Sequence, residues 1–427
     1  MKKYNNYKNS GVEWLGEIPE HWGEKKFKHI FSEKKKTTNV DLACGSISFG
    51  KVVYKDDEKI PESTKRSYQV LSNGDFLINP LNLNYDLISL RIALSDKDVV
   101  VSSGYIVLNN NLKLNKNYFK WLLHVFDVVY MKTLGSGVRQ TLSFTHIANC
   151  ELIFPPLEEQ DKMAEFLETK TTKIDQAIAI KQKQIELLKE RRQILIHKAV
   201  TRGLNENLKL KDSGVEWIGE IPEHWEVKKL RYLANCFPSN IDKHSKINEN
   251  EVRLCNYTDV YKNNFITDDM DLMIATASDE QIKKFTLKKG DIIITKDSET
   301  ASDIAVPTFV KENLTNVVCG YHLAMIRTYQ SCYSKYLFRA LQTKLFNTQF
   351  EVCSNGITRV GLGNSDLKNG FFLVPSEQEQ IDIAEFIEIG TTKIDTVIFS
   401  KVQEIEKLKE YKMSLIDSVV TGKVKVS

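Results

Sequence analysis

Two stretches of the sequence are copies of one long helix: TTKIDQAIAIKQKQIELLKERRQILIHKAV at residues 171–200 and TTKIDTVIFSKVQEIEKLKEYKMSLIDSVV at residues 391–420. In each copy, apolar residues recur at alternating steps of three and four, which is the pattern of a coiled-coil seam. The expected seam residues are Ile174, Ile178, Ile185, Leu188 and Leu195 in the first copy, and Ile394, Ile398, Ile405, Leu408 and Leu415 in the second. Because both surfaces are otherwise polar, we expect each helix to bury its stripe against the other, at about 1.5–3 kcal/mol per buried Ile or Leu.

Basic residues interrupt the apolar seam at the same two places in each copy. They are Lys181 and Arg192 in the first copy and Lys401 and Lys412 in the second. A charged seam position costs stability but fixes the register of two helices. The alternative is a pair of ordinary amphipathic surface helices on separate domains, and the duplicated interruptions favour the coiled coil over it.

The duplication extends beyond the helices, and internal repeats of this kind define the architecture of a chain. KNSGVEWLGEIPEHWGEKKFKHI at residues 8–30 returns as KDSGVEWIGEIPEHWEVKKLRYL at 211–233, and PPLEEQDKMAEFLE at 155–168 returns as PSEQEQIDIAEFIE at 375–388. Residues 31–154 and 234–374 differ from each other and share only short echoes such as GDFLI at 74–78 and GDIII at 290–294. The chain is therefore two copies of one fold, with constant scaffolding and divergent inserts.

Both divergent blocks have the composition of a mixed α+β domain. Each contains short β-rich runs bounded by Gly, Asn and Ser, and one apolar segment of helical length, at 118–131 in the first block and near 336–350 in the second. The predicted fold class is α+β, with two similar domains separated by two long helices that form an antiparallel, pseudo-two-fold coiled coil. The predicted parts are a first domain at 1–154, a short helix and first spacer helix at 155–210, a second domain at 211–374, and a short helix and second spacer helix at 375–427.

The boundary between the short and long helices follows from capping residues. Thr172 to Asp175 and Thr392 to Asp395 have the composition of N-terminal caps, and Gly390 supports a break in the second copy. A short helix at 158–167 and its copy at 378–387 are thus expected to be separate from the long helices.

Bulk properties limit the classes of function. A net charge of +3 with 27% charged residues means that, if the chain binds nucleic acid, its basic residues are concentrated on one face. The seven cysteines are scattered without a C-x-x-C pair, which predicts reduced thiols, a cytoplasmic location and no structural zinc. No signal segment and no apolar stretch of membrane-spanning length is present.

Tryptophans mark the constant motif that opens each copy. Trp14 and Trp22 in the first copy correspond to Trp217 and Trp225 in the second. Stacking on nucleic-acid bases is one interpretation. Because these residues belong to the constant part, we favour a structural role as buried aromatic anchors.

No catalytic constellation is present. The sequence lacks a phosphate loop, a dinucleotide-binding glycine motif and an H-E-x-x-H zinc motif. FPPL at 154–157 lacks the Asn of the amino-methyltransferase motif that it resembles, and Asp161, Glu168 and Lys170, which resemble a nuclease set, follow a helical pattern of surface charge. The eight histidines are isolated, and we interpret His146 and His322 as structural or contact residues. The chain is predicted to be non-catalytic, with no metal site of its own.

The tandem arrangement resembles the specificity subunit of type I restriction–modification systems along essentially its whole length. The residues that carry the resemblance are SGVEW at 10–14 and PEHW at 19–22 with their second copies, PPLEEQ at 155–160, and the repeated heptad helices. Ser376 to Gln378 depart from the pattern of the first copy.

The resemblance implies a DNA-binding protein of a defence system against foreign DNA, with two target-recognition domains that each read one half of a split site. It also implies two modification (methyltransferase) subunits and two ATP-dependent restriction subunits as partners. S-adenosylmethionine, ATP and Mg²⁺ would then belong to those partners, with no cofactor in this chain.

The spacer length agrees with this expectation. About 30 residues of helix at about 1.5 Å each span roughly 45 Å, and half-sites one helical turn apart are about 34–36 Å from centre to centre. Arg, Lys, Asn and Gln side chains read base edges best. In the loops, the candidate DNA-binding residues are Lys35, Asn79, Asn82, Arg91, Arg139, Gln140, Arg253, Asn256, Lys296, Asn355 and Arg359.

Alternative functions remain at this point. One is a non-enzymatic scaffold of α+β modules that binds protein. Another is the specificity subunit of a related restriction system with a separate methylase/nuclease chain. A self-contained methyltransferase or nuclease is the enzymatic alternative, which the missing motifs oppose.

Overall fold

The computed structural model describes residues 2–12, 14–82, 90–131, 140–205 and 207–426, and for residues 82, 140, 141 and 332 it describes the backbone only. The chain divides into two compact units: unit 1 is Met1–Lys181 with Val402–Ser427, and unit 2 is Gln182–Lys401. Each unit contains one domain of mixed helices and strands together with half of each long helix. Two similar α+β domains with two long helices are the fold class that the duplicated sequence predicts, and this prediction is confirmed.

The two long helices are continuous. Helix α5 (Leu157–Arg202) has 46 residues and helix α11 (Glu377–Val420) has 44, so the prediction of a separate short helix before each was wrong. Thr171 Oγ1 donates to the carbonyl of Glu168 (3.4 Å), which is the bond of a threonine inside a helix rather than at its cap.

Gly390 does not break α11 either. A Cβ on Gly390 would lie 2.8 Å from Leu195 Cδ1 of α5. The glycine therefore allows a close approach of the two helices, at a cost in helix propensity of about 1 kcal/mol.

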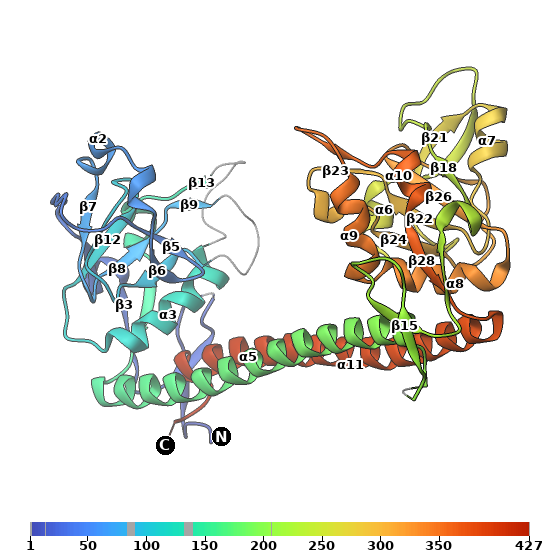
Figure 1. Ribbon diagram of the computed structural model, residues 1–427. Coiled ribbons are helices and arrows are strands. Elements are labelled where there is room, and N and C mark those ends of the chain that lie inside the picture. The colour runs from blue at the N-terminus through green and yellow to red at the C-terminus, as the bar shows by residue number, and fades with distance from the viewer. Residues whose placement is uncertain (1, 13, 83–89, 132–139, 206, 427) are drawn as a thin grey trace. The chain divides into compact units, whose positions relative to one another are not determined.

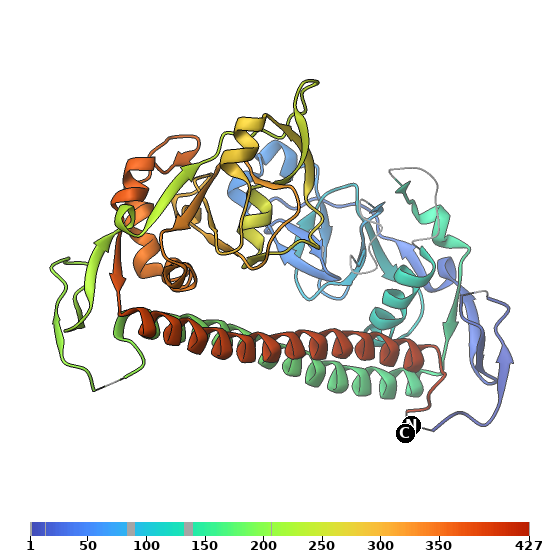
Figure 2. The same ribbon diagram turned by 90° about the vertical axis from the view of Figure 1, so that its right-hand side faces the viewer.

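The predicted seam residues face the partner helix. All of them are buried or half-buried, for example Ile174 and Ile394 (8% exposed each) and Leu415 (4%). In unit 1, the N-terminal half of α5 packs against the C-terminal half of α11, because Ile174 and Ile178 share one core with Leu408 and Leu415. In unit 2 the other two halves pack in the same antiparallel sense, and the helices lie side by side in both views (Figures 1 and 2).

Three of the basic residues that interrupt the seam pair with acids on the opposite helix. Lys412 Nζ lies 2.7 Å from Asp175 Oδ1 in unit 1, and Arg192 Nε lies 3.4 Å from Asp395 Oδ1 in unit 2. Lys181 pairs with Glu404. Since the two aspartates occupy the same place in the repeated TTKID sequence, the two copies use the same ion pair to set the helix register.

The domain of unit 1 is built on a four-stranded antiparallel sheet in the order β10 (Ile92–Leu94), β8 (Phe76–Ile78), β12 (Ile106–Asn110) and β4 (Phe31–Glu33). Smaller antiparallel pairs are β11 (Val99–Val101) with β7 (Gln69–Leu71), β5 (Gly45–Ser48) with β6 (Lys51–Tyr54), β14 (Glu151–Phe154) with β3 (Gly23–Lys26), and β1 (Tyr7–Asn9) with β2 (Glu17–Pro19). Its helices are α1 (Phe27–Ile30), α2 (Glu62–Lys65), α3 (Lys116–Val129) and α4 (Phe144–Ala148). Aromatic residues such as Phe31, Phe76 and Phe119 fill its core.

The domain of unit 2 has a five-stranded sheet in the order β18 (Ala234–Pro238), β26 (Leu323–Thr328), β22 (Ile292–Thr295), β24 (Pro307–Val310) and β20 (Phe265–Ile266). A second sheet has the order β21 (Met273–Ala277), β19 (Asn250–Cys255) and β25 (Val317–Cys319), and two further pairs are β17 (Glu226–Lys229) with β28 (Phe371–Val374) and β15 (Leu210–Asp212) with β16 (Glu220–Pro222). The helices are α6 (Tyr257–Lys262), α7 (Asp279–Phe285), α8 (Ser331–Leu341), α9 (Lys344–Cys353) and α10 (Asn364–Asn369).

The helix expected near 336–350 is thus two helices, α8 and α9. Thr343 separates them, because its Oγ1 donates to the carbonyl of Ala340 (2.8 Å) and accepts from the backbone N–H of Phe346 (3.5 Å). This is the N-cap geometry of a new helix, which the apolar pattern across the segment hides.

The constant motif of each copy is anchored on the first turn of the long helix. In unit 1, Glu159 Oε2 accepts from Trp22 Nε1 (3.0 Å) and from the Tyr4 hydroxyl (2.8 Å), and Glu159 Oε1 lies 2.6 Å from His21 Nε2. In unit 2, Glu379 makes the corresponding contacts with Trp225 and His224. Trp22 (1% exposed) and Trp225 (0%) are buried, which agrees with the predicted structural role. Trp217 is not a buried anchor, since it is 39% exposed and contacts the ring of Phe346 at its edge.

Candidate nucleic-acid interface

Unit 1 brings two candidate residues together on a short antiparallel ladder. Strand β9 (Leu81–Asn82) pairs with β13 (Gln140–Thr141), and Asn82 lies directly opposite Gln140. Just beyond the ladder, the backbone N–H of Leu142 donates to the carbonyl of Pro80 (3.0 Å). Arg139, the residue before β13, lies outside the described residues.

Unit 2 builds the same ladder. Strand β23 (Asp297–Ser298) pairs with β27 (Val360–Gly361), and the backbone N–H of Leu362 donates to the carbonyl of Lys296 (2.8 Å). In both units the ladder joins the end of a central strand of the main sheet, β8 or β22, to the segment before a short helix, α4 or α10 (Figure 1). The same structural element therefore carries different residues in the two units.

The ladder of unit 2 carries a cluster of charged and aromatic side chains. Asp297 Oδ2 lies 3.1 Å from Lys296 Nζ and 2.9 Å from His322 Nδ1. Arg359 Nη1 lies 2.9 Å from His322 Nε2, and Lys296 Nζ lies 5.7 Å from the centre of the Tyr321 ring. Two sequence predictions, Lys296 and Arg359, thus meet in one place.

Asn355 lies on the same loop. Its backbone forms an antiparallel bridge with Gly361, which closes a hairpin tip that contains Arg359. Ile357 at this tip is fully exposed. A Cβ on Gly356 would lie 1.9 Å from the carbonyl oxygen of Arg359, so the tip requires glycine there. The result is a narrow projection with an arginine, an amide and an apolar side chain.

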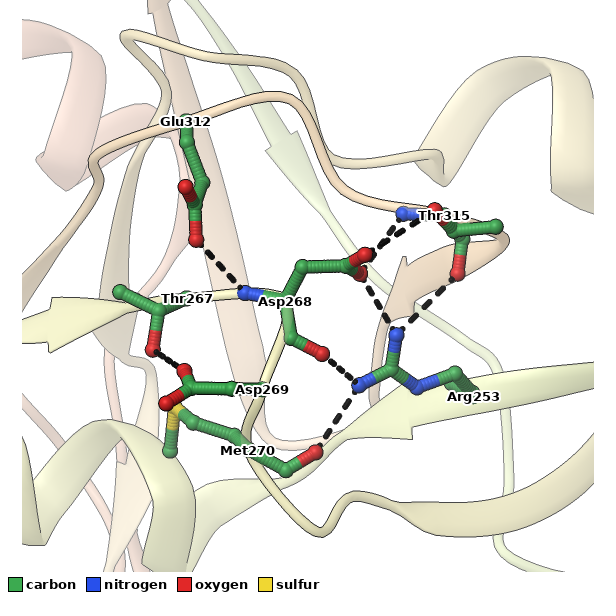
Figure 3. Close-up of polar contacts among 7 residues, drawn as sticks. All are labelled: Arg253, Thr267, Asp268, Asp269, Met270, Glu312 and Thr315. Atoms are coloured by element: carbon green, nitrogen blue, oxygen red, sulfur yellow. Dashed lines mark hydrogen bonds and ion pairs between the residues drawn. The ribbon is translucent and has the colours of Figure 1, made fainter.

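Arg253 serves the fold of unit 2 instead. Its Nη1 donates to Asp268 Oδ1 (2.6 Å), and its Nη2 donates to the carbonyls of Asp268 (2.6 Å) and Met270 (2.9 Å) (Figure 3). The backbone N–H of Thr315 also donates to Asp268; this bond and the Arg253 guanidinium lower the pKa of the carboxyl group. Arg253 therefore joins the loop before β21 to the loop before β25, and its two terminal nitrogens donate within the domain.

Asn256 also has a structural role, since its Oδ1 accepts from the backbone N–H of Thr258 (3.0 Å) and caps α6. In unit 1, Asn79 Oδ1 accepts from the backbone N–H of Leu81 (3.0 Å) and shapes the entry to β9. Lys35 is exposed beyond the end of β4.

Arg91 requires a correction. It is 3% exposed, its Nε donates to Asp127 Oδ1 (2.9 Å), and its backbone N–H donates to Asp127 Oδ2 (2.6 Å). The ion pair with Asp127 therefore holds the Arg91 side chain within the domain interior. The expectation of an exposed loop position was wrong for Arg91, because polarity in a loop does not report burial, and its contact with DNA stays a prediction.

Sequence reasoning missed the partners of Arg359. Asp297 was not considered, and His322 was interpreted only as a structural or contact residue. His322 has a left-handed backbone with φ 71°, which is uncommon for a residue other than glycine. No sequence signal near His322 indicates this conformation or a contact with the loop that carries Arg359.

Unit 2 also contains a cavity of ≈ 780 Å³ between β20, β24, α8 and the first turns of α11. Phe265, Phe309 and Phe338 line it, and the charged residues of its wall form ion pairs such as Arg339 with Glu388. The cavity shares no lining residue with the cluster around His322. Across the described residues, no group of three or more His, Cys, Asp and Glu side chains is placed to hold a metal ion.

Comparison with known proteins identifies the family of the chain. The model of the type I restriction modification DNA specificity domain matches residues 19–190 and 222–409, which is most of the chain. The chain belongs to this family of DNA specificity proteins. The matched model describes a DNA specificity domain, in agreement with the prediction of a specificity subunit.

Individual relatives carry the same description. The type I restriction enzyme MjaVIII specificity subunit of Methanocaldococcus jannaschii is 24% identical over 352 residues, 80% of this chain and 74% of that protein. The putative MjaX specificity subunit of the same organism is 24% identical over 463 residues, 99% of this chain and 98% of that protein. The EcoBI specificity subunit of Escherichia coli is 26% identical and matches 65% of this chain and 59% of its own length.

Solved structures share the fold. A chain from a study of complex assembly and conformational transition of the type I R-M system superposes with a TM-score of 0.71 at 13% identity, covering 95% of this chain and 99% of its own. The HsdS subunit of Thermoanaerobacter tengcongensis gives a TM-score of 0.51 at 14% identity, covering 95% of this chain and 98% of its own.

Within the described residues, no helix combines the length and apolarity needed to span a membrane.

Proposed function

We propose that this chain recognises a bipartite, asymmetric DNA site, with one half-site read by each unit. The observation that carries the proposal is the ladder that occurs once in each unit. Asn82 lies opposite Gln140 in the backbone register of one ladder, whereas Lys296, Asp297 and Arg359 meet through His322 at the other. Because amides pair best with adenine and guanidinium groups with guanine, unlike ladders predict unlike half-sites.

The long helices support a fixed distance between the half-sites. About 30 residues of the repeated segment correspond to roughly 45 Å of helix, and half-sites one turn of DNA apart are about 34–36 Å from centre to centre. Ion pairs such as Arg192–Asp395 and Lys412–Asp175 hold the two helices in one register. The base pairs between the half-sites would then be spanned without being read.

We further propose that the chain is the scaffold of a larger enzyme, with two modification subunits and two restriction subunits bound to it. An exposed stripe on α5 supports a docking role, since Ile180 (60% exposed), Leu187 (53%) and Ile194 (48%) recur at heptad spacing away from the seam. Large exposed apolar side chains in such a row are typical of a protein interface. S-adenosylmethionine, ATP and Mg²⁺ would serve those partners.

The alternative functions predict different partners. A protein-interaction scaffold would use the same stripe on α5 without binding DNA. The specificity subunit of a related restriction system would bind DNA but would assemble with one chain that combines methylase and nuclease activities. Purification with tagged neighbours from the host distinguishes the two assemblies by the number of partner chains.

A DNA mobility-shift assay at several salt concentrations tests DNA binding. The full chain, with its modification subunits added in a second series, should shift a pool of duplex DNA. Affinity should fall steeply with salt, because binding that neutralises phosphates releases counterions. Loss of the shift at all salt concentrations, in both series, would favour the protein scaffold.

A further inference from the structure

Arg359 is held in one orientation by a chain of hydrogen bonds that begins at a carboxylate. Asp297 accepts from His322 Nδ1 at 2.9 Å, so the ring proton lies on Nδ1. The other ring nitrogen, Nε2, then lacks a proton and accepts from Arg359 Nη1 at 2.9 Å. The network thus assigns the neutral tautomer of His322, with each ring nitrogen matched to its partner.

The backbone places His322 for this contact. Its φ of 71° lies in the left-handed region, where a non-glycine residue persists only when its surroundings hold it and where functional sites are frequent. The carbonyl of His322 accepts from the backbone N–H groups of Lys296 (2.8 Å) and Asp297 (3.3 Å). The same residue therefore ties its main chain to the ladder and aims its ring at the hairpin tip.

The rest of the Arg359 guanidinium remains available. Arg359 is exposed, and among the described residues its guanidinium makes no hydrogen bond besides the one to His322. A guanidinium carries five N–H donors in one plane. The single hydrogen bond to the imidazole ring of His322 fixes the plane of the guanidinium and leaves its other N–H groups free. Two such donors in one plane match the O6 and N7 acceptors of guanine.

Charge balance also favours a base over a phosphate as the partner. Lys296 lies 3.1 Å from Asp297 and neutralises the carboxylate that holds the histidine. The network therefore fixes the orientation of the Arg359 guanidinium and does not concentrate positive charge around it. Phosphate contacts need charge and tolerate a mobile side chain, whereas recognition of a base needs orientation.

We propose that Arg359 reads a guanine in the half-site of unit 2, and that His322, supported by Asp297, is the residue that positions it. This inference rests on the proposed function. It adds the base that is read, guanine, the half-site in which it lies, and the residue that reads it, Arg359. His322 itself does not contact the DNA.

The test is selection from a pool of randomised duplex DNA by the full chain, with the bound DNA sequenced. The wild-type chain should enrich two half-sites, one of which contains a guanine that Arg359→Ala no longer selects. We expect discrimination at that position to fall by about tenfold to a hundredfold. Arg231→Ala, a change at an exposed arginine in the constant part of unit 2, is the matched control and should leave every position unchanged.

Substitutions of His322 separate positioning from folding. His322→Gly keeps the left-handed backbone without strain but removes the ring, so preference should weaken roughly threefold to tenfold, the value of one hydrogen bond, at the position lost in Arg359→Ala. His322→Asn, which tolerates this backbone and retains an acceptor, should restore part of the preference. In the double variant with Arg359→Ala, His322→Gly should have no additional effect.

Other outcomes overturn the proposal. Equal loss of affinity for all sequences in Arg359→Ala would mean that Arg359 contacts phosphate. Unchanged preference in His322→Gly, with two wild-type half-sites still enriched, would overturn the positioning role alone. Failure of the wild-type chain to enrich any sequence would overturn the proposed function and this inference with it.

Discussion

Glu159 and Glu379 each connect parts of a unit that are distant in the sequence. Glu159 receives hydrogen bonds from Trp22 Nε1 and from the Tyr4 hydroxyl, which fixes the constant motif to the start of α5. Glu379 repeats this role at the start of α11. The same glutamate recurs in PPLEEQ and PSEQEQ. Its contact with the tryptophan and histidine of the constant motif therefore explains why both sequence blocks are repeated together.

Glu159→Gln should destabilise unit 1 by about 1–3 kcal/mol, because hydrogen bonds to a charged acceptor contribute more than neutral ones. Calorimetric melting at pH 7 measures the effect. Glu379→Gln is the matched variant for unit 2 and should lower the second transition instead. Equal shifts of both transitions in either variant would contradict a local anchor.

The same glutamate predicts a dependence of stability on pH. Partial burial of Glu159 raises its pKa, but its hydrogen bonds with His21, Tyr4 and Trp22 outweigh this effect and bring the pKa below its ordinary value of 4.5. A carboxyl group whose pKa is lower in the folded state contributes its stabilisation above the unfolded value and loses it as the pH falls through the folded value. Acidification below pH 4.5 should therefore destabilise wild-type unit 1 more steeply than the Glu159→Gln variant, and parallel curves would exclude this contribution.

The ion pair of Arg91 with Asp127 predicts a loss of stability without a change of DNA preference. Arg91→Met removes the guanidinium that pairs with the buried carboxylate of Asp127, and breaking a buried pair typically costs about 3–5 kcal/mol. The first-unit melting transition should fall accordingly. Lys35→Met, at an exposed site, should change stability by less than about 0.5 kcal/mol. Normal melting of the Arg91→Met variant would show that the pair does not stabilise the domain.

At the scale of the element, the long helices show what periodicity can and cannot predict. The seam at Ile174, Leu415 and their repeats followed from the sequence because burial of a helix stripe depends on spacing alone. The break before each long helix did not exist, because the cap-like residues Thr172 to Asp175 and Thr392 to Asp395 lie inside continuous helices, and Gly390 serves a contact between helices. Such contacts are not encoded in the neighbouring residues.

Gly390 gives the element-scale prediction. In an isolated helix, Gly→Ala adds about 1 kcal/mol of stability, but here the new Cβ would lie 2.8 Å from Leu195 Cδ1. Gly390→Ala should therefore give little or no gain in the wild-type chain and the full gain in a Leu195→Ala background. A double-mutant cycle measured by denaturant unfolding reports the difference, and equal effects in both backgrounds would mean that the two residues do not meet.

The candidate site of unit 2 was predictable only where local sequence marks a polar loop residue. Lys296, Asn355 and Arg359 were found as polar residues in loops, and the ladder brings them together. The pairing of His322 with Asp297 spans 25 positions in the sequence and depends on a left-handed residue that no local pattern marks. The burial of Arg91 was not predictable, because it depends on α3 packing over the sheet.

At the scale of the whole molecule, helix length should set the gap between half-sites. Insertion of one heptad after Lys181 in α5 and after Lys401 in α11 keeps the seam in phase and adds about 10 Å. This is about three base pairs of DNA at about 3.4 Å each. Sequencing of the selected DNA should show the same two half-sites with a longer gap. An unchanged gap would mean that the helices do not measure it.

The central claim is that two independent reading units recognise two unlike half-sites. The most direct measurement replaces residues 31–154 with the corresponding block of a relative and maps methylated adenines in cells that also contain the modification subunits. The account predicts that one half-site changes while the other half-site and the gap stay the same. A change in both half-sites, or in neither, would contradict it.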